Sequence, residues 1–217
     1  MKIWRFIDSP PFDIFRQMDL DRELFEKFIS DPGAVPILRI YRVSEPAVTV
    51  GRSYRGSSLP RTAPHLPVCM RPTGGGIVYH GGDLIYSVVA RAYSFPTFHQ
   101  VRTSYLSFHE TVQEAFEGLG IVTRLIRCDD PQARSNSKRR GLVEECFRRP
   151  VPTDVALGDQ KIAGGAQRRR PEGFLHQGSI QLPEGASFDA LKGALVPCFQ
   201  KKFGIVWQHE RERILQV

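Results

Sequence analysis

The pattern of apolar and polar residues predicts helices and strands in mixed order along the chain. Apolar residues recur every three or four positions over 13–29, 104–119 and 188–199, which is typical of amphipathic helices, and a kink is expected at Pro197. Runs rich in β-branched residues predict strands at 37–43, 47–50, 77–79, 84–91, 121–126, 154–157, 160–163, 174–182 and 205–207. The dipeptide Gly158-Asp159 predicts a hairpin turn, which places Lys161 on a strand beside it.

Several of these strands follow each other closely enough to form hairpins. The sequence therefore predicts an α+β fold, in which a largely antiparallel sheet packs on helices. A length of 217 residues favours one domain over 1–217. The segment 127–142 is rich in Arg, Ser and Asp and has few apolar side chains to bury, so we expect a mobile basic loop there.

Composition narrows the partners and the compartment. Lys and Arg number 30 against 23 Asp and Glu, a net charge of +7 that would attract an acidic partner. We expect no nucleic acid partner, since the basic residues do not alternate with aromatic ones as in a nucleic-acid-binding signature. No long apolar run or signal-peptide pattern occurs, so a cytoplasmic protein without membrane association is expected. The cysteines have no C-x-x-C spacing, so we expect neither a disulfide scaffold nor a metal site.

The segment 71–80 has the sequence Arg-Pro-Thr-Gly-Gly-Gly-Ile-Val-Tyr-His. Its three consecutive glycines would let the backbone approach a ligand more closely than a residue with a Cβ could. The segment matches neither the P-loop nor the dinucleotide-binding fingerprint, which disfavours ordinary nucleotide hydrolysis. Taken by itself, it could also be a flexible surface turn.

Two further segments carry candidate reactive groups. Lys161 is followed by small residues, Ala163 to Ala166, that would leave a groove open, so its ammonium could point at a carbonyl or an anion. A lysine at the solvated edge of a sheet would have the same pattern. Cys146 lies close to Arg148 and Arg149, and neighbouring cations favour the thiolate form of a cysteine. Cys69, Cys128 and Cys198 match no such pattern and are interpreted as structural.

The three segments together resemble the biotin/lipoate protein ligase and octanoyltransferase family of cofactor transferases. Residues 18–21, 41–51, 83–87, 154–167 and 173–180 also resemble family segments in their order and separation, so the likeness covers nearly the whole chain. It implies the family's catalytic-domain fold with an acyl tunnel, in which Lys161 points at the acyl carbonyl. It also implies that the acyl or acyl-adenylate pocket is lined by Arg71, Gly74, Gly75, Gly76, Val78, His80, Gly164, Ala166 and Gln167.

Two positions qualify this resemblance. His176 would support the pocket from behind rather than line it. Met70 stands where many family members carry a second arginine, which weakens any expectation about phosphate contacts.

The family contains two reactions. Lipoate ligases activate free lipoate with ATP and Mg²⁺, whereas octanoyltransferases move octanoate from acyl carrier protein through a cysteine thioester and need no cofactor. Cys146, 15 residues before Lys161 in a Cys-Phe-x-x-Pro setting, resembles the nucleophile site of the cysteine-dependent octanoyltransferases that are similar to lipoate-protein ligase A. The sequence ends soon after the catalytic module, so we expect no extra C-terminal domain like that of many ligases.

The resemblance therefore predicts an octanoyltransferase in which Cys146 and Lys161 are catalytic. Its partners would be octanoyl-acyl carrier protein and a lipoyl-carrier protein, such as the glycine cleavage H protein or a 2-oxoacid dehydrogenase subunit. Two alternatives stay open at this point. One is an ATP-dependent lipoate-protein ligase, and the other is a non-catalytic protein that binds an acyl group or a lipoyl domain.

Overall fold

The computed structural model describes residues 2–54, 65–130, 147 and 150–209. The helices are α1 (Ile14–Ser30), α2 (Val101–Gly118) and α4 (Phe188–Phe203), with short 3₁₀ turns at Ala92–Ser94 and Pro96–Phe98. The strands are β1 (Lys2–Asp8), β2 (Ile37–Tyr41), β3 (Ala47–Val50), β4 (Val68–Met70), β5 (Ile77–His80), β6 (Asp83–Ala90), β7 (Arg124–Leu125), β8 (Val155–Leu157), β9 (Gln160–Arg170), β10 (Gly173–Gln181) and β11 (Ile205–His209).

The strands form a large and a small sheet. The eight-stranded sheet has the order β11-β1-β2-β6-β10-β9-β8-β7, and the three-stranded sheet has the order β4-β3-β5. The pairs β1–β11, β1–β2 and β3–β4 are parallel, and the other paired strands are antiparallel. The prediction of a largely antiparallel α+β fold is confirmed.

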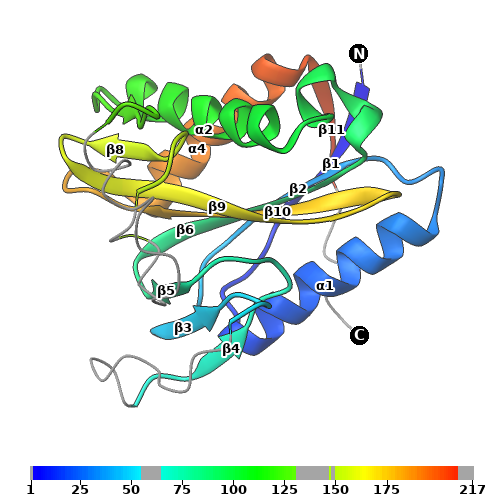
Figure 1. Cartoon of the computed structure of the whole chain (residues 1–217), viewed down its shortest axis with the longest axis horizontal. Coiled ribbons are helices and arrows are strands. Elements are labelled where there is room, and N and C mark those ends of the chain that lie inside the picture. The colour runs from blue at the N-terminus through cyan, green and yellow to red at the C-terminus, as the bar shows by residue number, and fades with distance from the viewer. Residues whose placement is uncertain (1, 55–64, 131–146, 148–149, 210–217) are drawn as a thin grey trace.

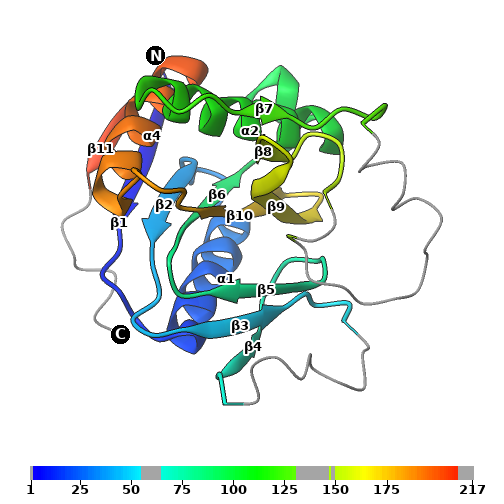
Figure 2. The same cartoon turned by 90° about the vertical axis from the view of Figure 1, so that its left-hand side faces the viewer.

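The large sheet separates two layers of different character (Figure 1). Helices α2 and α4 cover one face, while α1 and the small sheet lie against the other (Figures 1 and 2). We call these the helix face and the small-sheet face. Helix α1 begins where the Asp13 carboxylate accepts hydrogen bonds from the backbone N–H groups of Phe15 and Arg16. Helix α4 ends at Gly204, whose left-handed conformation (φ 56°) suits a glycine.

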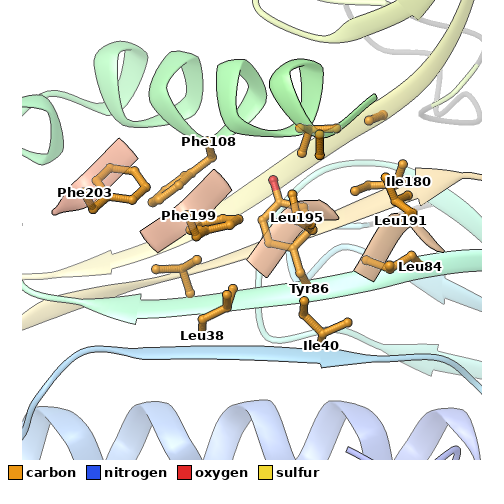
Figure 3. Packing of buried hydrophobic residues seen from close by; sticks show 14 of the residues in the cluster. Leu38, Ile40, Leu84, Tyr86, Phe108, Ile180, Leu191, Leu195, Phe199 and Phe203 are labelled. Carbon is orange, nitrogen blue, oxygen red and sulfur yellow. The ribbon is translucent and has the colours of Figure 1, made fainter. Parts of the chain in front are cut away.

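The main apolar core fills the helix face. Phe108 of α2 and Phe199 and Phe203 of α4 pack above the apolar side chains of β2, β6 and β10 (Figure 3). The ring centroids of Phe108 and Phe199 lie 6.2 Å apart, and Tyr86 of β6 packs edge-on to Phe199 at 5.9 Å. Burial of these apolar side chains away from water stabilises the fold through the hydrophobic effect.

Most of the predicted elements are present, with three differences. The strand predicted at 121–126 is wrong except for Arg124–Leu125, since Val122 is 84% exposed and Gly120 turns the chain with φ 74°. Strands β1 and β4 were not predicted. Helix α4 continues through Pro197 to Phe203.

The expected mobile basic loop and the expected lack of membrane association can be compared with the described residues only. From residue 131 on, the basic loop predicted at 127–142 lies outside the described residues. Within the described ranges, no helix is both long enough and apolar enough to cross a membrane.

Candidate active site

The glycine-rich segment is folded tightly against strand β3. The guanidinium of Arg71 is buried and donates hydrogen bonds to the Gly74 carbonyl from Nε (2.9 Å) and Nη2 (2.6 Å), and from Nη1 to Thr49 Oγ1 (3.2 Å). Gly51 lies against this loop so closely that a Cβ there would come within 2.0 Å of the Gly75 carbonyl oxygen. Gly75 itself has φ 93° and is exposed. Arg71 therefore holds the shape of the loop, and Gly75 is presented at its surface.

His80 lies between the two sheets with both ring nitrogens engaged. Its Nδ1 is 2.7 Å from Asp83 Oδ2, and its Nε2 is 2.9 Å from Thr49 Oγ1. Since a carboxylate only accepts, Nδ1 carries the proton, and the Thr49 hydroxyl can donate to Nε2. Burial by itself would raise the pKa of Asp83, but His80, Ser179 and the Gly81 N–H together lower it.

A hydrogen-bonded chain connects the glycine loop to helix α1. The Thr73 hydroxyl donates to Gln177 Oε1 of β10 (2.7 Å), and Gln177 Nε2 donates to Asp21 Oδ2 of α1 (2.7 Å). Asp21 Oδ1 also accepts from Arg39 Nη1 (2.7 Å), and both side chains of this ion pair are fully buried. Burial raises the pKa of Tyr41, whose hydroxyl donates to the same carboxylate.

Lys161 forms the other charged centre. Its Nζ lies 2.7 Å from Asp154 Oδ2, and both side chains are more than nine-tenths buried. The lysine arm crosses over Gly164, where an added Cβ would come within 2.6 Å of Lys161 Cε. The ring of Phe147 is 5.4 Å from Lys161 Nζ, measured to the ring centroid. A single ammonium is therefore fixed between a carboxylate, an aromatic ring and a glycine.

The strand register decides which residues share a face. Gly164 pairs with Ser179, and Ala166 pairs with Gln177. Directly opposite residues project to the same face, so Gly164, Ala166, Gln177 and Ser179 belong to the small-sheet face. The pairing of β8 with β9 is irregular beside Lys161, and the lysine side chain lies where a Cβ on Gly164 would project, which places it on this face too. Gly165, between Gly164 and Ala166, is exposed and Ala166 is half-buried, so the backbone of β9 is accessible at this point.

Gln167 lies on the opposite face of the sheet from the lysine. Its amide contacts Ser104 of α2 (3.0 Å between Nε2 and Oγ) and His176 Nδ1 (3.3 Å). His176 also contacts the Tyr86 hydroxyl through Nε2 (3.1 Å) and is fully buried on the helix face. Burial, followed by the nearby His109 and Arg169, lowers the pKa of His176 well below its usual value. The structure therefore does not bring Gln167 to the face on which Lys161 lies.

The remaining predicted residues are placed as follows. Val78 pairs with Thr49 in the small sheet and has the same orientation as His80, and Gly74 and Gly76 belong to the loop held by Arg71 and Gly51. Met70 is 51% exposed. Cys146 lies outside the described residues.

The other cysteines and the question of a metal can be examined in the described part of the chain. Burial is the main cause that raises the pKa of the Cys69 and Cys198 thiols, while Cys128 is exposed. Among the described residues, no group of three or more His, Cys, Asp or Glu side chains could hold a metal ion.

Sequence reasoning missed the residues that hold the site together. Asp154, Thr49, Gln177 and Asp21 are all buried and bonded to predicted site residues or to one another. The position of Asp154 could have been noticed in the sequence. It directly precedes β8, which forms a hairpin with β9, and the hairpin brings it near Lys161 at the start of β9. Asp21 and Gln177 lie in segments that resemble the family, but they are 156 positions apart, and no pattern in the sequence indicated that they are bonded to each other.

The structure is that of an α+β domain in which a buried lysine ion pair of β9 and a small sheet with a glycine-rich loop lie on the same side of the large sheet. The family model of the lipoyl protein ligase A/B catalytic domain matches residues 13–198. The chain belongs to this family.

Similar proteins include two octanoyltransferases LipM. The one from Carboxydothermus hydrogenoformans is 28% identical over 188 residues, which cover 84% of this chain and 66% of that protein. The one from Geobacillus kaustophilus is 30% identical over 188 residues, covering 83% of this chain and 66% of that protein. The chain thus spans just under two thirds of the length of these relatives.

Solved structures share the fold. A lipoate-protein ligase A bound with ATP superposes with a TM-score of 0.76 at 21% identity, covering 98% of this chain and 90% of that one. A bipartite lipoate protein ligase from Thermoplasma acidophilum gives a TM-score of 0.71 at 19% identity, covering 98% and 89%.

Proposed function

We propose that the protein is an octanoyltransferase, which moves octanoate from acyl carrier protein through a Cys146 thioester to a lysine of a lipoyl-carrier protein. One structural observation carries the proposal. The ring of Phe147, the residue that follows Cys146 in the sequence, lies against the buried Lys161 ammonium. The likeness to the octanoyltransferases LipM supports the choice of this reaction within the family.

The reaction divides into two acyl transfers. In the first, the Cys146 thiolate attacks the octanoyl carbonyl carbon, a new thioester C–S bond forms, and the carrier thiolate leaves. In the second, the amine of the acceptor lysine attacks that thioester, an amide bond forms, the amine loses a proton, and the Cys146 thiolate leaves. Each step has a thiolate leaving group, and neither consumes ATP, so no cofactor is required.

Lys161 contributes positive charge where negative charge develops. A buried ammonium stabilises both a thiolate and the oxyanion of a tetrahedral intermediate more strongly than it could in water. The ion pair with Asp154 keeps the ammonium in one position, so that no reorganisation is needed when charge develops. We assign catalytic roles to Cys146 and Lys161 on this basis.

The acyl chain would lie on the small-sheet face. Gly164 and Ala166 have little or no side chain there, and Val78 supplies an apolar surface from the small sheet. Arg71, Gly74, Gly75, Gly76 and His80 would bound the same space through the loop and the end of β5. Gln167 would support the pocket from the opposite face of the large sheet, where its amide contacts His176.

The proposed partners are proteins that carry the acyl group. A net charge of +7 favours docking of an acidic partner such as acyl carrier protein. The acceptor would be a lipoyl-carrier protein, either the glycine cleavage H protein or a 2-oxoacid dehydrogenase subunit. These reactions would take place in the cytoplasm.

The test is the intact mass of the protein after incubation with octanoyl-acyl carrier protein in the absence of ATP. We expect a hydroxylamine-labile octanoyl adduct on the wild-type chain and none on Cys146→Ala. Cys128→Ala, which removes an exposed thiol, is the matched control and should acquire the adduct.

Other outcomes identify the alternatives. If no adduct forms but a carrier domain is lipoylated once lipoate, ATP and Mg²⁺ are supplied, the protein is a ligase and the proposal is wrong. If neither reaction occurs and the protein still binds a lipoyl domain, it is a binding protein.

A further inference from the structure

A strained turn sets the position of the aspartate that pairs with Lys161. Residues 151–154 form a β-turn in which the Asp154 N–H donates to the Val151 carbonyl (3.1 Å) and the Val151 N–H donates to Asp154 Oδ2 (2.8 Å). Pro152 is in the second position and Thr153 in the third, with φ 83°. Among the described residues, Thr153 is the one non-glycine residue with positive φ. A β-branched residue is disfavoured there, and glycine is the usual choice.

The turn is held in place from two sides. The chain at Ile126 receives a hydrogen bond from the Thr153 N–H (2.8 Å) and donates one to the Asp154 carbonyl (2.8 Å). On the helix face, Nδ1 of His109 in α2 lies 2.7 Å from the Thr153 carbonyl oxygen. Because a carbonyl only accepts, His109 must carry its proton on Nδ1.

The ring of His109 packs beside the rings of Tyr105 and His176, and its one side-chain hydrogen bond in the described part of the chain is the one to Thr153. His109 is 1% exposed, and its Nε2 has no hydrogen-bond partner in the described part of the chain. An unpartnered buried ring nitrogen costs free energy. The unpartnered nitrogen of His109 and the disfavoured φ of Thr153 are two costly features, and the hydrogen bond to the Thr153 carbonyl joins these two residues directly before Asp154.

We propose that His109 is a positioning residue of the acyl-transfer site. By holding the Thr153 carbonyl, it keeps the turn in its left-handed conformation, aims the Asp154 carboxylate at Lys161 and so fixes the ammonium. The inference rests on the proposed function, since it concerns the same lysine. The inference adds to the site a residue of helix α2, on the other side of the large sheet from Lys161.

The experiment compares two substitutions of the same residue. His109→Leu removes the donor, while His109→Asn keeps an amide N–H close to the place of Nδ1. We expect the kcat of octanoyl transfer to fall about 10- to 100-fold in His109→Leu, with KM for the acyl donor little changed, because misplacement of a catalytic group costs rate rather than binding. His109→Asn should recover most of kcat. His99→Leu, at an exposed position next to α2, should behave as wild type.

A second readout does not depend on activity. The rate at which an amine-acetylating reagent modifies Lys161, measured by peptide mass spectrometry, should be low in the wild type because Nζ is buried and paired. It should rise several-fold in His109→Leu and stay low in His109→Asn. If wild-type transfer is absent, the proposed function fails, while this labelling comparison still tests the positioning role.

Two results would overturn the inference. One is a His109→Leu protein that is less stable but has wild-type kcat and wild-type labelling of Lys161, which would make His109 a packing residue. The other is failure of Thr153→Gly to restore kcat and low labelling in the His109→Leu background, since glycine adopts φ 83° without help. If His109→Leu alone folds poorly, the double variant with Thr153→Gly still tests whether His109 acts through the conformation of Thr153.

Discussion

The two faces of the large sheet bury polar groups in opposite ways. On the helix face, His109, His176, Tyr86 and Tyr105 lie among aromatic rings and stay neutral, since burial lowers the pKa of both histidines and raises that of Tyr105 to about 12. On the small-sheet face, buried carboxylates pair with buried cations, Asp21 with Arg39 and Asp154 with Lys161, and the Asp83 carboxylate accepts a hydrogen bond from His80.

The difference between the two faces shows that the packed core, which stabilises the fold, and the charged groups, which could take part in a reaction, lie on opposite sides of the large sheet. Neutral groups in a packed aromatic core are tolerated because no ion has to leave water. Charged pairs are costly to bury and are stable only while each partner is present. The small-sheet face therefore offers the proposed chemistry charges that are already held in fixed positions.

The largest effect is expected from breaking a pair on the small-sheet face. Asp21→Ala would leave Arg39 buried without its carboxylate and remove the acceptor of Tyr41, Ser87 and Gln177. We expect a loss of about 3–5 kcal/mol in the free energy of unfolding, measured by urea denaturation. Asp19→Ala removes a carboxylate of the same helix that pairs with the exposed Arg22, and should cost less than about 1 kcal/mol. Equal losses would contradict the comparison.

The helix face predicts a pH dependence. The unfolded chain binds protons at His109 and His176 near pH 6.5, whereas the folded chain binds them only at lower pH, because burial lowers the pKa of each histidine. Stability is therefore unaffected by these two groups above about pH 7 and falls as the pH drops below about 6.5. Urea titrations between pH 5 and 8 measure the slope. His176→Gln should reduce the slope, and an unchanged slope would mean that other groups cause it.

Gly178 of β10 and Gly164 of β9 allow the two faces of the large sheet to be compared by the same substitution. A Cβ at Gly178 would lie 2.2 Å from Cε1 of Tyr86, a ring that is packed and cannot move away. Gly178→Ala should therefore cost about 1–3 kcal/mol of stability. A Cβ at Gly164 meets the flexible end of Lys161 instead, so Gly164→Ala should cost less stability and more transfer rate. Thermal unfolding and the octanoyl-transfer assay measure the two effects, and the reverse pattern would contradict the assignment of faces.

The sequence predicted the elements that have a strong local pattern and missed those that depend on distant partners. Helix α1 and strand β3 followed from periodicity and β-branched content. Strand β1 is stabilised by β2 and β11, which are remote in sequence, and its pattern of mixed charges and aromatics gave no clear alternation. The same reason hides the site: Lys161 was predicted from its neighbours, but Asp21, Arg39 and Gln177 meet only after folding.

The smallest effect concerns a strand that extends further than predicted. Strand β9 continues from Ala163 to Arg170 through three consecutive arginines, because β10 pairs with it throughout and the guanidinium groups of Arg168 and Arg169 lie over aromatic rings. Arg168 and Arg170 both pair with Glu26 of α1, at 3.2 Å and 2.8 Å, and Glu26 is 42% exposed.

Glu26→Gln should therefore cost only about 0.5–1 kcal/mol, and the difference from wild type should shrink between 0.05 and 1 M salt (about 14 and 3 Å of screening length). Urea unfolding at the two salt concentrations measures it. The salt dependence distinguishes this exposed pair from Asp21–Arg39, for which salt should change little because both ions are out of solvent. A loss of several kcal/mol at Glu26, insensitive to salt, would mean that the arginine end of β9 is held by buried charge and that the two kinds of pair do not differ.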